Sequence, residues 1–377
     1  MKIVTIVGAR PQFVKAATVS RAISNFNKSS DYLISEVIVH TGQHYDENMS
    51  KIFFEQLDIP NPDYNLEVGG GSHGSMTGKM IELIEGVLFT EKPDQVLIYG
   101  DTNSTLAGAI SAAKLHIPIV HVEAGLRSFN MKMPEEINRI LSDRVSSLLF
   151  CPTNEAVQNL KNEGITKGVL KVGDVMLDAS IFYRKLARQN STILSDLRKE
   201  YPRLRRKEYV LVTCHRAENT DDLIQLVGIV NGLSEIAKKT TVIFSLHPRT
   251  KKMLVKHELM IELKDVIIID PVSYLDMVSM EESAQVIITD SGGVQKEAYF
   301  FGVPCITLRY ETEWIETVRI GANELVGSDT SKILQAYNNL SLRKDIAIGS
   351  SNLYGDGSAA NVIVQSMFND FFNNSKL

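Results

Sequence analysis

The segment 96–127 reads VLIYGDTNSTLAGAISAAKLHIPIVHVEAGLR and contains the pattern that decides the fold. The apolar runs Val96–Tyr99 and Ile119–Val122 flank a stretch, Asn103–Leu115, with the character of a helix. Both runs are continuous rather than alternating, which is typical of parallel strands covered by helices on both faces. The segment therefore predicts a strand–helix–strand unit of a parallel sheet.

The same order of short apolar run, turn and helical stretch extends over most of the chain. The other expected strands are Ile3–Val7, Val37–Val39, Tyr209–Thr213, Thr241–Leu246, Val266–Ile269, Val286–Thr289 and Cys305–Leu308. The other expected helices include Glu135–Val145, Asp222–Lys238, Gly293–Phe301 and Ala359–Phe372. Because 377 residues exceed the usual length of one domain, we expect an α/β protein with two doubly wound sheets.

The composition excludes several classes of protein. Lys and Arg total 40 against 45 Asp and Glu, and a net charge of -5 argues against nonspecific binding of nucleic acid. No apolar run approaches the ~18 residues of a membrane-spanning helix. Cys151, Cys214 and Cys305 form no CxxC pair, which favours a reducing compartment over a disulfide scaffold. We therefore expect a cytoplasmic protein without nucleic acid or membrane partners.

The loop after the first expected strand carries positive charge at a place where doubly wound sheets bind ligands. Residues 8–12 read GARPQ, and Lys15 lies one helical turn further on. A glycine lets a ligand approach the backbone, and Arg10 and Lys15 favour an anion near a helix N-terminus. An ordinary loop with surface cations is the alternative interpretation. Without a GxGxxG fingerprint, a nicotinamide cofactor is not expected.

Three carboxylates follow strands or begin a helix in the first half of the chain. Asp101 and Glu123 come after two of the expected strands, and Glu135 begins a helix that carries Arg139 one turn later. Helix capping would explain Asp101, and helix-start preferences would explain Glu135, but no capping spacing explains Glu123. Because acids at one edge of a sheet can converge and shift each other's pKa, these residues are candidates for acid–base catalysis.

Strand ends in the second half of the chain carry histidines and a glycine-rich helix start. His215 and His247 each follow an expected strand, and an arginine comes soon after each of them. Residues 290–297 read DSGGVQKE, in which SGG opens a helix and presents free backbone N–H groups. Such a helix start favours a phosphate, and the carboxylate of Glu297 could accept hydrogen bonds from ribose hydroxyls.

Other familiar patterns are absent. The glycine-rich stretch 69–79 lacks the spacing of a P-loop and is expected to be a flexible loop. The eight histidines form no HExxH or HxxEH pattern, and no serine lies in GxSxG. Neither a metal site nor a hydrolase nucleophile is therefore expected.

Six motifs in collinear order resemble the non-hydrolysing UDP-N-acetylglucosamine 2-epimerase family. They are Gly8–Lys15, Gly100–Thr102, His121–Arg127, Pro134–Arg139, Thr213–Arg216 and Asp290–Glu297. The resemblance implies a homodimer with a glycosyltransferase-B-like fold, in which two Rossmann-like doubly wound domains face a cleft. It implies an N-terminal domain of residues 1–172 with the returning helix 359–377, and a UDP-binding C-terminal domain of residues 173–358.

The resemblance also implies a reaction on a UDP-2-acetamido sugar without a cofactor. UDP leaves C1, a base removes the C2 proton to give a bound 2-acetamidoglucal, and UDP adds back after protonation from the other face. The implied catalytic residues are Asp101, Glu123 and Glu135 as the acid–base group, with Lys15 and His215. The implied substrate-binding and UDP-binding residues are Arg10, Arg139, His247, Ser291, Gly292, Gly293, Glu297 and Glu313.

Departures from the family pattern bear on the substrate. GARPQ stands where the family commonly has GTRPE, and residues 312–316 read TEWIE instead of TERPE, so that Trp314 replaces an arginine. This combination resembles the branch that acts on UDP-2,3-diacetamido-2,3-dideoxy-glucuronate in surface-polysaccharide synthesis; the UDP-GlcNAc to UDP-ManNAc reaction is the other expectation. A glycosyltransferase of the same architecture, or a non-catalytic sugar-nucleotide-binding protein, would leave the carboxylates of the first half unexplained.

Overall fold

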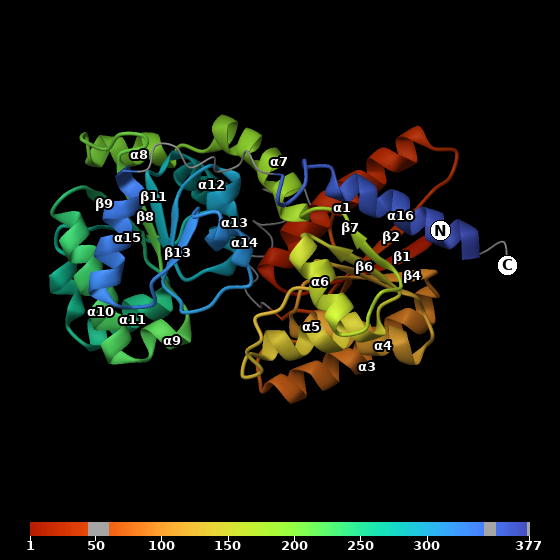
Figure 1. Ribbon diagram of the computed structural model, residues 1–377. Helices are drawn as coiled ribbons and strands as arrows, with labels where there is room; N and C mark the ends of the chain where they lie inside the picture. The colour runs from red at the N-terminus through yellow and green to blue at the C-terminus, as the bar shows by residue number, and fades with distance from the viewer. Residues whose placement is uncertain (44–59, 343–351, 375–377) are drawn as a thin grey trace. The chain divides into compact units, whose positions relative to one another are not determined.

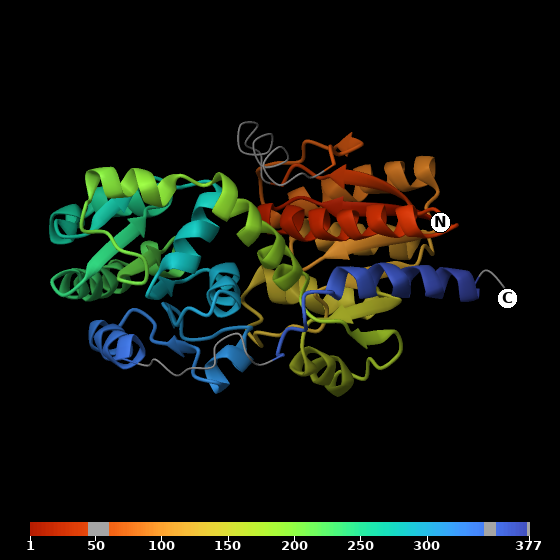
Figure 2. The same ribbon diagram turned by 90° about the horizontal axis from the view of Figure 1, so that it is seen from above.

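The computed structural model describes residues 1–43, 60–342 and 352–374 of the chain. The chain divides into two compact units, Met1–Ile181 with Leu353–Leu377 (unit 1) and Phe182–Asn352 (unit 2). Each unit is built on one parallel sheet flanked by helices (Figure 1 and Figure 2). The division falls inside helix α7 (Val175–Asn190), whereas the sequence predicts a crossing between residues 172 and 173.

Unit 1 contains a seven-stranded sheet in the order β3-β2-β1-β4-β5-β6-β7. The strands are β1 (Lys2–Val7), β2 (Ser35–His40), β3 (Tyr64–Asn65), β4 (Gln95–Tyr99), β5 (Ile119–Val122), β6 (Leu148–Cys151) and β7 (Val169–Lys171). The helices are α1 (Arg10–Ser29), α3 (His73–Glu91), α4 (Asn103–Lys114), α5 (Pro134–Val145), α6 (Asn154–Asn162) and α16 (Ala359–Asn374). The order 3-2-1-4-5-6 within this sheet is that of a Rossmann fold.

Unit 2 repeats this order in a six-stranded sheet, β10-β9-β8-β11-β12-β13. The strands are β8 (Tyr209–Thr213), β9 (Thr241–Ser245), β10 (Ile267–Ile269), β11 (Val286–Thr289), β12 (Cys305–Thr307) and β13 (Asn323–Leu325). The helices are α8 (Ile193–Glu200), α9 (Ala217–Thr220), α10 (Leu223–Ala237), α11 (Pro248–Lys256), α12 (Tyr274–Ser283), α13 (Gly292–Phe300), α14 (Ile315–Arg319) and α15 (Thr330–Leu342), with a 3-10 turn at Leu259–Leu263. In the described part of the chain, no helix is both long enough and apolar enough to span a bilayer.

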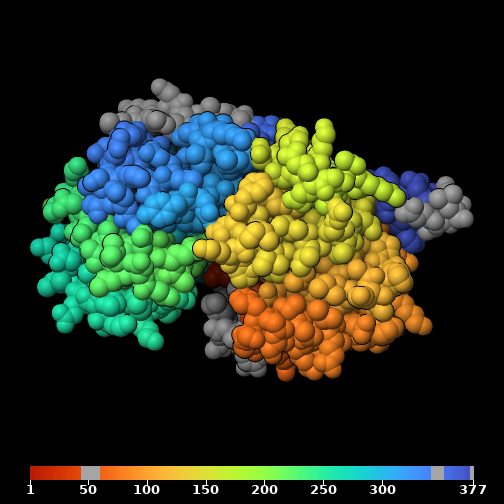
Figure 3. Space-filling model, turned by 60° about the horizontal axis from the view of Figure 1, so that its bottom comes forward, coloured from red at the N-terminus to blue at the C-terminus, as the bar shows by residue number. Residues whose placement is uncertain are grey.

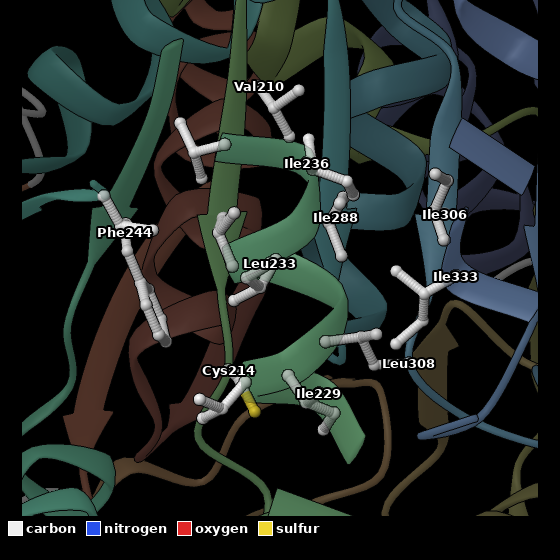
Figure 4. Close-up of a cluster of buried hydrophobic side chains, with 14 of the residues drawn as sticks. Val210, Cys214, Ile229, Leu233, Ile236, Phe244, Ile288, Ile306, Leu308 and Ile333 are labelled. Carbon is white, nitrogen blue, oxygen red and sulfur yellow. The ribbon is translucent and has the colours of Figure 1, made fainter. Parts of the chain in front are cut away.

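The core of unit 2 lies between α10 and the sheet. Ile229, Leu233 and Ile236 recur at helical spacing on α10 and are at most 1% exposed. They pack against strand residues such as Phe244 and Ile288 (Figure 4). Because β8 and β11 are buried on both faces, they require the continuous apolar runs from which they were predicted.

Helix α16 packs on unit 1 beside α1. The ring of Phe368 lies 5.1 Å from the rings of Phe26 and Tyr32, measured between centroids. At the start of α16, the backbone N–H of Ala360 donates to Asp178 Oδ1 on α7 at 2.9 Å. The acid on α7 thereby supplies the capping contact that an N-cap residue usually makes within its own helix.

Helix α3 corrects one expectation from the sequence. The stretch 69–79 was expected to be a flexible loop, but residues 73–79 are the first two turns of α3. Ser72 is the N-cap, and its side chain accepts from the backbone N–H of Ser75. The glycines of this helix face open space, so that they cost helix propensity but no packing.

Candidate active site

In each unit, the strand order reverses between two central strands, and the candidate residues follow these strands. In unit 1 the reversal lies between β1 and β4, and in unit 2 between β8 and β11. Ligands of doubly wound sheets bind outside the carboxyl ends of the strands at such a point. Each unit therefore carries its own candidate site, and the two are described in turn.

Lys15 and Glu123 form a buried ion pair at the carboxyl edge of the unit 1 sheet. Lys15 comes from α1 and Glu123 follows β5, and Lys15 Nζ donates to Glu123 Oε1 at 2.7 Å. Their side chains are only 8% and 11% exposed. A Cβ added to Gly100 would lie 3.4 Å from Lys15 Nζ and 3.7 Å from Glu123 Oε1. The ion pair therefore lies directly against the turn that carries the next residue, Asp101.

Asp101 is held by the guanidinium of Arg139. Arg139 Nη2 donates to Asp101 Oδ2 at 2.6 Å, and Arg139 Nη1 donates to Glu136 Oε2 at 2.7 Å. Glu136 also accepts from the backbone N–H of Ser128 at 2.9 Å, so the arginine is anchored from behind. The Asp101 side chain is 27% exposed, whereas that of Arg139 is 6% exposed. The carboxylate of Asp101 is thus fixed in direction and still open to a ligand, as proton transfer requires.

Asp143 is a fully buried acid that the sequence pattern does not single out. Its Oδ2 accepts from the backbone N–H of Gly125 at 3.1 Å and from Arg127 Nη1 at 2.8 Å. Its Oδ1 lies 2.7 Å from His121 Nδ1. Asp143 therefore ties the loop after β5 to α5. A histidine inside the apolar run Ile119–Val122 is the one sequence signal that pointed to such a partner.

Gln12 explains one departure from the family pattern. Its Oε1 accepts from the backbone N–H groups of Gly8 and Ala9 at 2.9 and 3.0 Å. Its Nε2 donates to the carbonyl oxygen of Tyr99 at 2.8 Å and to Thr105 Oγ1 at 2.9 Å. The amide, which is 1% exposed, thus locks the loop after β1 to the end of β4 and to α4. A glutamate in its ionised form could not donate to Tyr99.

Glu135 stands apart from these networks, and Arg10 begins α1. Both side chains are half-buried, Glu135 in the first turn of α5 and Arg10 at the first position of α1. Within the described residues, Glu135 forms no hydrogen bond or ion pair, although it shares α5 with Arg139. The structure thus brings together Lys15, Glu123, Asp101 and Arg139, and leaves Glu135 at the border of the group.

In unit 2, the buried carboxylate of Asp290 organises the loop after β8. It accepts from the backbone N–H groups of His215 and Arg216, each at 2.9 Å, and from Asn219 Nδ2 at 3.1 Å. His215 Nδ1 lies 3.4 Å from Asp290 Oδ1, which directs the other ring nitrogen away from the sheet. The His215 side chain is 43% exposed and is therefore accessible to a ligand.

His247 lies next to His215, with 5.5 Å between the ring centroids. Its Nδ1 accepts from the backbone N–H of Arg249 at the start of α11. Burial, followed by repulsion from His215 and Arg249, lowers the pKa of His247. A neighbouring anion would reverse the electrostatic part of this effect, so the two histidines suit a negatively charged ligand.

The glycine-rich start of α13 adjoins Glu313 and Trp314. Ser291 is the N-cap residue of α13, but its side chain makes no capping hydrogen bond, so the first N–H groups of the helix stay available. A Cβ added to Gly292 would lie 3.7 Å from Trp314 Nε1 and 3.9 Å from Glu313 Oε2. Gly293 follows on the same turn. This arrangement has the backbone donors and the dipole end of a diphosphate-binding site.

Glu313 and Trp314 are themselves held by buried cations. Arg309 donates from both terminal nitrogens to the carboxylate of Glu313, at 3.1 and 3.2 Å. Lys296 Nζ lies 3.9 Å from the centroid of the Trp314 ring, a cation–π contact. The aromatic ring that replaces the family's arginine is therefore still associated with a positive charge.

Glu297 lies in α13 and is 5% exposed. It accepts from the hydroxyl of Tyr274 at 2.8 Å. Burial, and then the charge of Glu297, raise the pKa of Glu281 well above its usual range, and both carboxyl oxygens of Glu281 lack a hydrogen-bond partner in the described structure. The charged form of Glu281 is therefore disfavoured, and Glu297 is the carboxylate of this pair that could accept from ribose hydroxyls.

Comparisons with known proteins agree over nearly the whole chain. The sequence model of the UDP-N-acetylglucosamine 2-epimerase family matches residues 28–368. The chain is 51% identical, over 369 residues, to the UDP-2,3-diacetamido-2,3-dideoxy-D-glucuronate 2-epimerase of Pseudomonas aeruginosa, with 97% of this chain and 99% of that protein covered. It is also 51% identical, over 373 residues, to the UDP-N-acetylglucosamine 2-epimerase homolog of Methanococcus maripaludis, with 98% and 100% covered.

Solved structures lead to the same family. The crystal structure of Methanocaldococcus jannaschii UDP-GlcNAc 2-epimerase in complex with UDP-GlcNAc and UDP has a TM-score of 0.86 and 45% identity, and the match covers 98% of this chain and 99% of that chain. The match confirms the expected α/β, glycosyltransferase-B-like fold class. The chain therefore belongs to the UDP-N-acetylglucosamine 2-epimerase family of isomerases.

Proposed function

We propose that this chain is a non-hydrolysing 2-epimerase of a UDP-2-acetamido sugar. The observation that carries the proposal is the pair of carboxylates, Asp101 and Glu123, on neighbouring strand ends of unit 1. Each is paired with a buried cation, Arg139 or Lys15. A protein that only bound a nucleotide sugar, or transferred the sugar, would have no use for two such acids at this edge.

The groups of unit 2 suit the UDP part of the substrate. We assign the diphosphate to His215, His247 and the backbone N–H groups of residues 291–293. Glu297 would accept from the ribose hydroxyls. These donors stabilise the negative charge that collects on the diphosphate when the bond between C1 and oxygen breaks.

The acids of unit 1 suit the proton transfers. When UDP leaves with the bonding electrons, the electron-poor C1 makes the C2–H acidic, and a carboxylate removes that proton as the C1–C2 double bond forms. A second acid then protonates C2 from the opposite face, and UDP adds back to C1. Asp101, Glu123 and Glu135 are the candidates, and Lys15 keeps the charge of Glu123 balanced in a poorly solvated place.

For the sugar, we propose UDP-2,3-diacetamido-2,3-dideoxy-D-glucuronate, whose epimerised product would serve surface-polysaccharide synthesis. The proposal is supported by the relative of that name at 51% identity and by the departures at Gln12 and Trp314. The cation–π contact of Lys296 with Trp314 also leaves a buried positive charge near the Gly292 turn, which would suit a carboxylated sugar.

Proton NMR in deuterated water tests the proposal. The protein is incubated separately with UDP-N-acetylglucosamine and with the diacetamido-glucuronate, and we expect deuterium at C2 and a gluco–manno mixture, faster with the second. Faster turnover of UDP-N-acetylglucosamine would overturn the choice of sugar. Two unchanged substrates, or sugar transfer that depends on an added acceptor, would overturn the epimerase.

We also propose that the protein acts as a homodimer. Helix α5 exposes Ile137, Leu141 and Val145, which are spaced by four residues and are 41–46% exposed. Helices α3 and α5 lie on the surface of unit 1, in orange and gold in Figure 3. Sedimentation equilibrium should give a dimer, and Leu141→Arg should shift it towards monomer. Ile224→Arg, an exposed position of unit 2, is the control and should leave it unchanged.

We propose that the protein is located in the cytoplasm. Cys151, Cys214 and Cys305 are all buried free thiols, as expected of a protein from a reducing compartment. Fractionation of the native host, with the chain detected by antibody, tests it.

A further inference from the structure

His121 is a fully buried histidine whose two ring nitrogens both have partners. It lies on β5, beside β4 in the unit 1 sheet. Its Nδ1 is 2.7 Å from Asp143 Oδ1, and its Nε2 is 2.7 Å from the carbonyl oxygen of Gly100. The epimerase chemistry proposed above uses neither His121 nor Asp143.

The partners determine the protonation state of the ring. A carbonyl oxygen can only accept, so Nε2 must carry a proton for Gly100. Asp143 Oδ2 accepts from the backbone N–H of Gly125 and from the guanidinium of Arg127, so this side chain serves as a carboxylate. A carboxylate also only accepts, so Nδ1 must carry a proton too. With both nitrogens protonated, the ring is an imidazolium cation.

The surrounding charges balance this cation. Asp143 of α5 shares its charge between His121 and Arg127, and Arg127 is also paired with Glu163 at the end of α6, at 2.6 Å. Cys151 on β6 is a further titratable group near Asp143, and burial, and then Asp143, raise the pKa of its thiol. Two cations and two carboxylates thus form one cluster beneath the loops of the candidate site.

Both loops above the cluster have backbone conformations that need support. Gly100 has φ +62° and Gly125 has φ +80°, and Glu123 has φ +70°, which is unfavourable for a residue with a side chain. His121 holds the carbonyl of Gly100, directly before Asp101. Asp143 holds the N–H of Gly125, two residues after Glu123.

We propose that His121 is a positioning residue, which through its two ring nitrogens fixes the turn carrying Asp101 while its partner Asp143 fixes the loop carrying Glu123. The inference rests on the proposed epimerase function for its effect on turnover, but its structural part does not.

Nitrogen-15 NMR tests the charge of His121 without any assay of activity. In uniformly labelled protein, the signals of His121 are identified by their disappearance in His121→Asn. Because each ring nitrogen faces an acceptor, we expect both of them to have the shift of a protonated nitrogen. One nitrogen with the shift of an unprotonated ring nitrogen would overturn the proposal.

Two substitutions separate the two contacts of the ring. The amide nitrogen of His121→Gln can replace Nε2 and donate to Gly100, whereas that of His121→Asn can replace Nδ1 and donate only to Asp143. We expect kcat to fall about 100-fold in His121→Asn, and less than 10-fold in His121→Gln, with KM changed little because the proposed UDP-binding groups lie mainly in unit 2.

The control is His116→Asn, an exposed position of the same unit with φ +58°, which asparagine tolerates; it should keep normal kcat. A His121→Asn variant that folds and keeps normal kcat, or equal losses in the Asn and Gln variants, would overturn the positioning role. A wild-type protein inactive on both UDP-sugars would refute the epimerase instead, and the NMR result would still decide the charge of His121.

Discussion

Replacing Asp178 by asparagine should stabilise the protein, and more so as the pH rises. Asp178 Oδ1 accepts from the N–H of Ala360, but Oδ2 is buried and has no hydrogen-bond partner in the described structure. Burial, opposed by the N–H groups of Ala360 and Ala359, raises the pKa of Asp178 from 3.8 to about 6. Ionisation of this carboxyl therefore weakens the folded state.

The expected size of the effect follows from linkage. The folded state holds the proton of Asp178 more tightly than the unfolded chain does. The stability that this bound proton contributes is fully present below pH 3.8 and is lost as the pH rises through about 6. A shift of about 2 pKa units corresponds to about 3 kcal/mol at pH 8 and roughly half of that at pH 5. Asparagine keeps the acceptor oxygen and cannot ionise. Asp178→Asn should therefore gain up to about 3 kcal/mol at pH 8.

Urea unfolding at pH 5 and pH 8, followed by circular dichroism, measures this gain. Fluorescence of Trp314, the single tryptophan of the chain, reports on unit 2 and serves as an internal reference. Asp356→Asn, at an exposed acid whose pKa is lowered by hydrogen bonds from Ser358, is the control and should bring no gain. The reasoning is refuted if Asp178→Asn destabilises unit 1 at pH 8, or if its gain is the same at both pH values.

Three further substitutions test the site. Asp101→Asn should lower kcat by about 10²–10⁴-fold and leave UDP affinity unchanged in calorimetry, because it removes a proton-transfer group and none of the proposed UDP ligands. The exposed Asp31→Asn is the control. Near-normal turnover of Asp101→Asn would exclude the acid–base role. Gln12→Glu should lower the free energy of unfolding by about 1–3 kcal/mol at pH 8, because a carboxylate oxygen would face the carbonyl of Tyr99; unchanged urea unfolding would contradict this. Asp290→Asn should weaken UDP binding about 10–100-fold in calorimetry by releasing the loop of His215, and a wild-type dissociation constant would show that the loop holds without it.

The sequence predicts strands as continuous apolar runs between turn signals, but the prediction missed β6 (Leu148–Cys151), whose residues LLFC are such a run. Ile119–Val122, Tyr209–Thr213 and Val286–Thr289 are confirmed with the expected bounds. The strands β3, β7 and β13 have two or three residues and mixed polarity, so no periodicity could indicate them. Such strands form because a neighbouring strand offers hydrogen bonds, which is a property of the sheet and not of the segment.

The candidate site was predictable as a set of strand ends but not as a set of contacts. Asp101 and Glu123 could be found because polar residues directly after buried runs are placed by topology. The partners of these acids come from helices, and whether Lys15 or Asp143 faces the site depends on how each helix is rotated on the sheet. Gln12 and His121 are even less visible, because each has a role only through backbone groups that no sequence pattern marks.

The packing of α16 on unit 1 has a consequence for synthesis on the ribosome. Unit 1 needs Leu353–Leu377, but about 170 residues of unit 2 are translated between the two parts of unit 1. At roughly 5–20 residues per second, the nascent first part waits about 10–30 s with the surface around Phe26 and Tyr32 uncovered. Unit 2, whose segments are contiguous, can complete its sheet during this time. Helix α16, which is made after unit 2, is thus the element that completes unit 1.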